Sequence, residues 1–289
     1  MIAVQRDGET MELHRTLRLE GTLFLMALGY LTRLPVPADL PESDDLTVRA
    51  VKYQPAVGAL VGGIAATVLW LASAVLPGMV AVLLGVAAAI VVTGAFHEDG
   101  LADAADGLGA GRDRNQTLHI MNDARLGTYG GLALGLVLAL RVALLAAMPP
   151  LEAGLALIAA HGVARMGVVH VMARNTSAHL VGLRALMPNV TPDGYRIALA
   201  STLVLMVPLV LAVGPLATLF GFVAAVLCAQ VVRILFIRRI GGWTGTALAP
   251  RSRWAKSAST SASRSGSDGL TRPLSGAPGG KTCSEERYF

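Results

Sequence analysis

Long apolar runs that come in pairs constrain the fold of this chain more than any other feature. Each run has about 20 residues, the length that an α-helix needs to cross the hydrocarbon core of a bilayer. Hydrophobic residues make up 54% of the 289 residues and charged residues 15%, which is too apolar for a soluble domain. We therefore predict an all-α fold, a polytopic integral membrane helical bundle. About six transmembrane helices are expected, at residues 56–76, 79–96, 130–148, 151–172, 196–213 and 216–237.

The charges of the connecting loops predict the orientation of this bundle. Each pair of apolar runs is joined by a short proline-containing turn without lysine or arginine, whereas the longer loops are basic. By the positive-inside rule, the side with the basic loops is the cytoplasm. The net charge of +5 therefore indicates membrane topology and no nucleic-acid partner. The basic loop residues are Arg33, Arg49, Lys52, Arg112, Arg114, Arg125, Arg174, Arg184, Arg238 and Arg239.

The N-terminal part carries a shorter apolar stretch. Residues 17–31 are apolar, but the prolines of residues 32–37 (TRLPVP) are expected to stop a helix there. We predict an interfacial helix that lies in the membrane surface rather than a span. Residues 1–12 are predicted to be an extension, and residues 13–245 the membrane domain.

The segment 96–131 is a polar island between two apolar runs, and its acidic residues suggest a metal site. Asp99, Asp103 and Asp106 stand at i, i+4 and i+7, so a helix would place them on one face. Like charges at this spacing repel one another, and a cation between them would relieve the repulsion. Hard oxygen ligands suit Mg²⁺ or Mn²⁺, and Mg²⁺ commonly binds together with substrate phosphates. The alternative is a solvated acidic helix start, which the helix dipole favours by itself.

The same island carries arginines and glycines that suit a phosphate ligand. Arg112, Arg114 and Arg125 offer planar donors, and glycines allow backbone N–H groups to approach phosphate oxygens. Phosphoryl transfer depends mainly on positioning and charge neutralisation, which metal ions and arginines supply. The island therefore favours a transferase acting on a phosphate-bearing substrate at the cytoplasmic face. The glycines are Gly107, Gly109, Gly111, Gly127, Gly130 and Gly131.

Ionisable residues inside the predicted spans include Arg141, His161 and Arg165. Buried charge in a membrane is costly and usually faces the bundle interior, unless the side chain snorkels to the interface. Arg141 is near the middle of its span, so we predict that it faces the bundle. Arg165 is close enough to its cytoplasmic end for snorkelling to remain an alternative. For His161 we favour a hydrogen bond between helices.

Five sequence segments together resemble the cobalamin synthase family, adenosylcobinamide-GDP ribazoletransferase. Residues 97–107 read HEDGLADAADG, where the family pattern is HLDGLADxxDG. Residues 111–114 (GRDR), 120–130 (IMNDARLGTYG), 32–37 (TRLPVP) and 241–245 (GGWTG) match further family patterns. The resemblance covers roughly residues 17–245.

The resemblance implies an integral enzyme of the bacterial inner membrane that completes the nucleotide loop of cobalamin. Its substrates would be adenosylcobinamide-GDP and α-ribazole or its 5′-phosphate, with Mg²⁺ as cofactor, GMP as leaving group and lipid as surroundings. Whether the enzyme forms homo-oligomers is left open. Asp99, Asp103 and Asp106 would hold Mg²⁺, and Asp123 would orient or deprotonate the attacking hydroxyl, with Arg125 and Asp106 as further catalytic residues. Arg112, Arg114, Arg125 and Arg165 would neutralise phosphate charge.

The chain departs from the family pattern at two places. Glu98 stands where the pattern has leucine, which adds a fourth acid to the island. After Gly245 the family continues TGDxLGA and a last apolar helix, whereas this chain continues TALAP and a polar tail. One added G before an ACT-GCC-TTG-GCG-CCG reading of TALAP would encode DCLGA. We therefore predict that residues 246–289 are a disordered, out-of-frame tail and that the altered C-terminus impairs activity.

Two other classes of protein fit the sequence less well. CDP-alcohol phosphotransferases use the motif DGxxAR followed by GxxxDxxxD, which this sequence lacks. A divalent-cation transporter would place carboxylates in mid-span, commonly in repeated halves. Here the acids cluster at one edge of the membrane and no internal repeat is found.

Overall fold

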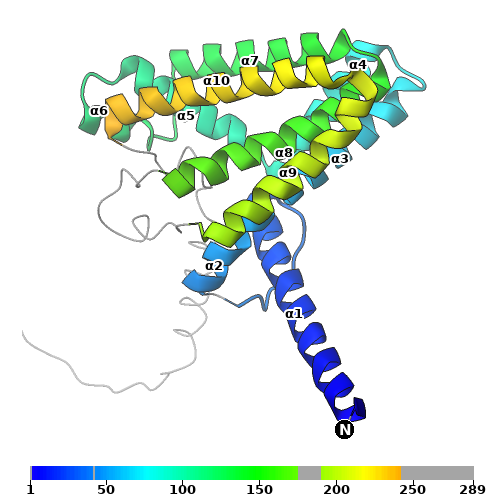
Figure 1. The fold of residues 1–289 in the computed structure, drawn as a ribbon. Coiled ribbons are helices and arrows are strands. Elements are labelled where there is room, and N and C mark those ends of the chain that lie inside the picture. Colours follow the sequence, from blue (N-terminus) through cyan, green and yellow to red (C-terminus); the bar gives the residue numbers. More distant parts are fainter. Residues whose placement is uncertain (1, 42, 175–189, 242–289) are drawn as a thin grey trace, which may run out of the picture. The chain divides into compact units, whose positions relative to one another are not determined.

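The computed structural model describes residues 2–41, 43–174 and 190–241, and within these ranges the regular structure is helical, without strands. The predicted all-α membrane fold is confirmed (Figure 1). The predicted tail, residues 246–289, lies outside the described residues. The helices are α1 (Ile2–Leu31), α2 (Asp44–Ala50), the 3-10 turn η1 (Val51–Tyr53), α3 (Gln54–Ser73), α4 (Gly78–Thr93), α5 (Phe96–Ala110), α6 (Arg114–Ile120), α7 (Thr128–Ala146), α8 (Pro150–Arg174), α9 (Pro192–Val213) and α10 (Pro215–Ile240).

Five of the predicted spans correspond to segments that are long and apolar enough to cross a membrane. They end in α3, α7, α8, α9 and α10, and the first of them starts at Asp44, ahead of α3. The sixth predicted span, 79–96, is not one straight helix. α4 has 16 residues and is followed, after a bend of 87°, by α5. At 1.5 Å per residue α4 is about 24 Å long, so the bent pair is a broken span or a re-entrant segment.

Helix α1 joins the predicted extension and the predicted interfacial helix into one helix that begins at Ile2, because no proline interrupts it. It is not among the described segments that are long and apolar enough to span. The Glu20 carboxylate attaches α1 to η1: it lies 2.6 Å from Lys52 Nζ and accepts a hydrogen bond from Tyr53 Oη at 2.7 Å. Partial burial would raise the pKa of Glu20, but these two contacts outweigh it and lower that pKa.

The centre of the bundle is the close contact between α3 and α8, with α4 against the other side of α3. Gly58 and Gly62 lie one turn apart on α3, and a Cβ on either would overlap the α8 backbone near His161 and Ile158. Small residues at this spacing let two membrane helices approach closely, which helps because apolar contact alone gains little in lipid. Buried aliphatic side chains complete this core: Val61, Ala65, Leu69, Val82, Val86, Ala89, Leu145, Ala153 and Leu157.

The bend between α4 and α5 is set by two residues with left-handed backbone. Gly94 has φ 70° and Ala95 has φ 60°, which an alanine adopts only at a cost of about 1 kcal/mol. Residues 32–37 (TRLPVP) hold this bend in place through Arg33. Its backbone N–H donates to Val92 O at 2.7 Å, and its side-chain Nη2 donates to Gly94 O at 3.3 Å. A Cβ on Gly94 would overlap the Arg33 side chain. The bend turns the acidic helix α5 away from the axis of α4.

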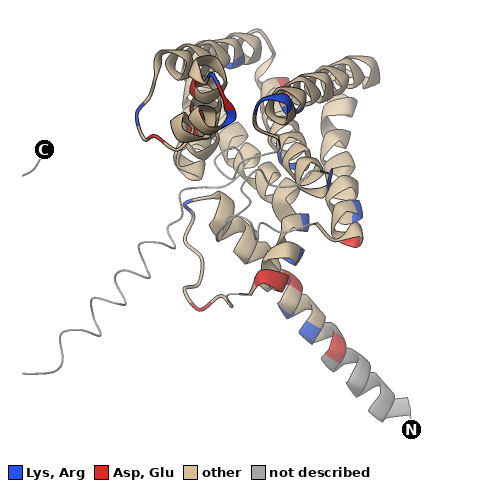
Figure 2. Cartoon of the chain, turned by 90° about the vertical axis from the view of Figure 1, so that its left-hand side faces the viewer, with Lys and Arg blue, Asp and Glu red and all other residues tan. Residues whose placement is uncertain are grey.

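Large parts of α7, α9 and α10 expose apolar side chains. On α10 the buried residues are Thr218, Phe236 and Ile240, and most of its other large side chains are exposed. Surfaces of this kind are expected where lipid rather than water surrounds a helix. Figure 2 shows charged residues at helix ends, in connecting loops and along α1, whereas the long helices are uncharged over most of their length.

Candidate active site

The buried carboxylate of Asp106 joins α5 to the start of α7. Its Oδ2 accepts the backbone N–H of Gly127 at 2.7 Å, and its Oδ1 accepts that of Gly130 at 2.8 Å. The first N–H groups of a helix have no partner within the helix, and a carboxylate there also interacts favourably with the helix dipole. Through these two hydrogen bonds Asp106, which is 7% exposed, caps α7 from the neighbouring helix α5. Both oxygens of Asp106 already accept backbone hydrogen bonds, which leaves them less available to a metal ion or substrate. The predicted metal-binding and catalytic roles of Asp106 stay predictions.

The glycines of the polar island permit this contact and others like it. A Cβ on Gly130 or Gly127 would overlap the Asp106 carboxylate. On α5, a Cβ on Gly107 would overlap Met121, and a Cβ on Gly109 would overlap the Tyr129 ring. At these positions the structure shows close approach between protein segments, and the predicted approach of backbone to phosphate stays a prediction.

The segment between α6 and α7 carries an exposed acid–arginine pair. Arg125 Nη2 lies 2.7 Å from Asp123 Oδ2, and the Arg125 backbone N–H donates to Asp123 Oδ1 at 3.1 Å. The Arg125 side chain is 89% exposed and that of Asp123 is 29% exposed. The hydrogen bonds from Arg125 lower the pKa of Asp123 to about 2. Asp123 is therefore a charged, weakly basic carboxylate at neutral pH.

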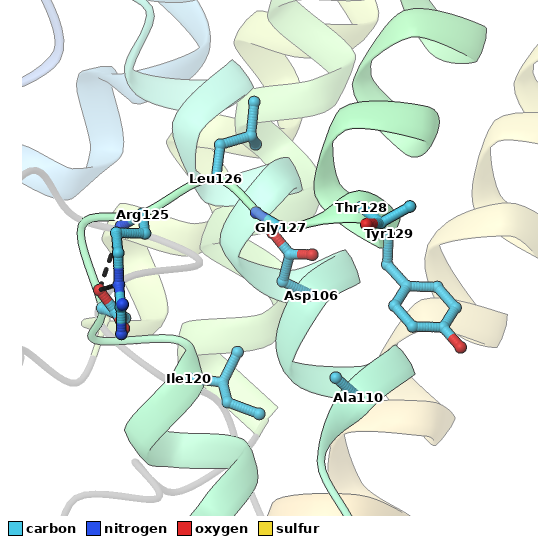
Figure 3. Close-up of a pocket in the computed structure, with 9 residues that line it drawn as sticks. Asp106, Ala110, Ile120, Arg125, Leu126, Gly127, Thr128 and Tyr129 are labelled. Atoms are coloured by element: carbon cyan, nitrogen blue, oxygen red, sulfur yellow. Dashed lines mark hydrogen bonds and ion pairs between the residues drawn. The ribbon is translucent and has the colours of Figure 1, made fainter.

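These residues line an open cavity of about 340 Å³ at the end of α5 (Figure 3). The cavity brings together the three residues predicted to be catalytic, Asp106, Asp123 and Arg125. Figure 3 shows the Asp106 side chain pointing toward Gly127, and Arg125 on the loop that leads to Leu126. No role for the Tyr129 side chain, which also lines the cavity, was predicted from the sequence. The remaining lining residues are Ala110, Ile120, Leu126, Gly127, Thr128 and Tyr129.

The other predicted phosphate-binding arginines lie outside this cavity lining. Arg112 is exposed and lies in the turn between α5 and α6. Arg114 donates through Nε to Ile240 O at 3.0 Å, which satisfies a carbonyl at the C-terminus of α10. The GRDR segment therefore also joins α6 to α10. Arg165 is buried on α8, beside Arg141 and His161 rather than at the cavity.

Asp99 and Asp103 lie on α5 before Asp106, with Asp99 exposed and Asp103 partly buried. Among the described residues, no three His, Cys, Asp or Glu side chains are grouped so as to hold a metal ion. Mg²⁺ does not require such a group, because it commonly takes one or two carboxylates and completes its shell with water and substrate phosphates. Two aspartates one helical turn apart fit that mode of binding.

Fold and site together define a polytopic membrane protein with an acid–arginine cavity at one end of its bundle. The chain matches the cobalamin-5-phosphate synthase family over residues 23–248. The chain therefore belongs to this family. The match ends just after the point at which the sequence departs from the family pattern.

Curated relatives agree with the family match. The adenosylcobinamide-GDP ribazoletransferase of Ralstonia pickettii is 39% identical over 225 residues, which cover 77% of this chain and 87% of the relative. The protein of that name from Bradyrhizobium diazoefficiens is 42% identical over 77% of this chain and 85% of its own. The one from Shewanella frigidimarina is 48% identical over 50% of this chain and 56% of its own. No solved structure matches the chain.

Proposed function

We infer that the chain is an adenosylcobinamide-GDP ribazoletransferase, which catalyses the last step of cobalamin nucleotide loop assembly. A ribose hydroxyl that is free in both α-ribazole and its 5′-phosphate attacks the cobinamide-linked phosphorus of adenosylcobinamide-GDP. A new P–O bond forms, the bond to the GMP oxygen breaks, and GMP leaves. The observation that carries this inference is the 39% identity to a protein of that name over 225 residues, which include the cavity.

The cavity suggests how its residues contribute to this reaction. Arg125 is exposed and presents a planar guanidinium to solvent, so it is available for phosphate oxygens. Asp123, with its pKa lowered to about 2 by Arg125, is too weak a base to take a proton efficiently. Of the two roles predicted for Asp123, we therefore favour orienting the attacking hydroxyl by accepting its hydrogen bond.

Magnesium is proposed at Asp99 and Asp103, with Asp106 holding the helix that presents them. When bound there, Mg²⁺ would neutralise charge on the diphosphate. The face of α5 on which these aspartates lie offers the hard oxygen donors that Mg²⁺ prefers. Arg112 and Arg114 lie close in sequence to this helix and are proposed to add positive charge for the GDP portion.

We further propose that the protein lies in the bacterial inner membrane with the cavity on the cytoplasmic face. Support comes from the loops: the short turns around residues 74–77, 147–149 and 214 lack lysine and arginine, and the cavity lies with the basic loops. Nucleotide substrates and Mg²⁺ are available on that side.

The test is a transfer assay with the full chain purified in detergent. We expect Mg²⁺-dependent release of GMP together with incorporation of α-ribazole into the corrinoid product. Asp103→Ala should abolish turnover and leave membrane insertion intact. A version recoded so that Asp-Cys-Leu-Gly-Ala follows Gly245, as the predicted reading frame has it, is expected to be faster. Metal flux in vesicles without product in either version would instead indicate a transporter, and an active Asp103→Ala variant would rule out its metal role.

A further inference from the structure

A group of ionisable side chains lies inside the bundle, apart from the cavity. It consists of His97 and Glu98 in the first turn of α5, Arg141 on α7, and His161 and Arg165 on α8; we call it the buried arginine cluster. Arg165 is 5% exposed and His161 is 7% exposed. Arg141 Nη2 lies 2.6 Å from His161 Nε2, which confirms both the bundle-facing arginine and the helix–helix contact predicted for the histidine.

The cluster contains two guanidinium cations and one carboxylate. Glu98 interacts electrostatically with both arginines, and the two arginines repel each other. Glu98 can compensate one positive charge but not two. An uncompensated charge inside a membrane protein is strongly destabilising, so such groups usually pair or line a functional path.

The hydrogen-bonding capacity of the cluster is also incomplete. Among the described residues, Arg165 Nε and Nη2 are buried and have no hydrogen-bond partner. The same holds for Glu98 Oε2, His97 Nε2 and His161 Nδ1, so Glu98 has one carboxylate oxygen without a donor while both Arg165 nitrogens lack an acceptor. An arginine has only donors, so these two atoms need an acceptor and cannot bind a cation. A buried donor without an acceptor destabilises the protein, and an arriving acceptor would remove that cost.

The first turn of α5 adds further donors at the same place. The residue before it, Ala95, has no side-chain cap to offer, so the first N–H groups of α5 lack a side-chain acceptor there. The positive end of the helix dipole therefore adds to the charge of Arg141 and Arg165. Planar guanidinium donors together with helix N–H groups match the geometry of phosphoryl oxygens.

We propose that the buried arginine cluster binds a singly charged phosphodiester. Arg141 and Arg165 contact its oxygens, and Glu98 neutralises the second positive charge, so the site prefers a monoanion over a phosphomonoester dianion. Membrane phospholipids carry a phosphodiester with one negative charge. In a substrate linked to a nucleoside diphosphate, each phosphate group also carries one negative charge. The proposal stands on the cluster and does not depend on ribazole transfer.

The test uses full-length protein in a phosphate-free maltoside detergent at pH 8, without substrates. Thermal unfolding is followed while dimethyl phosphate, a monoanionic diester, or methyl phosphate, a monoester that is dianionic at this pH, is added. We expect dimethyl phosphate to protect the wild type at lower concentration. Glu98→Gln keeps the shape and removes the negative charge, and should shift the preference by about tenfold toward methyl phosphate.

Arginine variants and one control complete the experiment. Arg165→Gln and Arg141→Gln should each weaken protection by dimethyl phosphate at least about tenfold. Arg196→Gln, at an exposed arginine on α9, should leave it unchanged. The proposal would be overturned if the wild type and Glu98→Gln showed the same preference between the two phosphates, or if both arginine variants were fully protected by dimethyl phosphate. If an arginine variant does not fold, the Glu98→Gln comparison alone still decides.

Competition identifies the source of the phosphodiester. Phosphatidylglycerol in mixed micelles should displace dimethyl phosphate if the site takes a lipid headgroup. Adenosylcobinamide-GDP should displace it, and the lipid should not, if the site takes part of a soluble substrate. If dimethyl phosphate binds to the cluster but the protein shows no ribazole transfer, the proposed function fails while this proposal stands.

Discussion

The two ends of α5 combine acids with arginines in opposite ways. At its C-terminal half, the buried Asp106 has both oxygens occupied by backbone N–H groups, and the Asp123–Arg125 pair beside it is exposed. At its N-terminal end, Glu98 interacts with two arginines inside the bundle, and among the described residues Arg165 Nε, Arg165 Nη2 and Glu98 Oε2 have no hydrogen-bond partner. One end is thus satisfied within the protein, and the other is not.

The difference separates structural polar groups from ligand-binding ones. A buried group with all hydrogen bonds made fixes the position of its neighbours, because breaking any of these bonds leaves an unpaired group. A buried group that lacks partners destabilises the empty protein and is kept where a ligand completes it. By this criterion Asp106 is an anchor, and the buried arginine cluster has the properties of the binding site proposed above.

The largest effect is expected from filling the space beside Asp106. In Gly130→Ala, the new Cβ would overlap the Asp106 carboxylate and lie 2.8 Å from Ala102 O, so α5 and α7 must separate. We expect a loss of about 1–3 kcal/mol in stability and a severe loss of activity. Gly131→Ala is the matched control, since its Cβ meets only Leu126 Cδ2 at 4.0 Å. Thermal unfolding of the two variants measures the contrast, and equal melting temperatures would contradict the anchor.

A smaller effect is expected from the exposed pair. The Asp123 pKa of about 2 lies below the ordinary value of about 4, so its contribution to stability is present above pH 4 and lost as pH falls through 2. Arg125→Gln should raise this pKa toward 4 with little change in stability, because the pair is exposed. The acid limb of the pH profile of kcat/KM should then move upward. An unchanged limb, with activity otherwise retained, would show that Asp123 does not contribute through its charge.

Much of the fold follows from the sequence because lipid leaves few choices for an apolar run. The spans at α3, α7, α8, α9 and α10, and the helix that carries Asp99, Asp103 and Asp106, are found where the runs and the spacing predicted them. The bend at Gly94 and Ala95 was not predicted, since it depends on the distant Arg33 and on an alanine in a left-handed conformation. Hydropathy alone extended that span through residue 96.

The site was predicted only in part for a similar reason. The sequence identified Asp106, Asp123 and Arg125, which line one cavity. It could not show that Asp106 would accept N–H groups 21 and 24 residues away, because that contact depends on how α5 packs against α7. Arg141, His161 and Arg165 were each noticed, yet their meeting with Glu98 follows from the packing of three helices.

The most direct test of the account compares Asp106→Asn with Asp99→Asn. An asparagine at 106 has one carbonyl oxygen for two N–H groups, so we expect a stability loss of about 1–3 kcal/mol together with lost turnover. Asp99 is exposed, so Asp99→Asn should lose most of its turnover, and added Mg²⁺ should not restore it, while the melting temperature stays at the wild-type value. Unchanged stability in Asp106→Asn, or equal destabilisation in both variants, would contradict the division between an anchoring and a metal-binding aspartate.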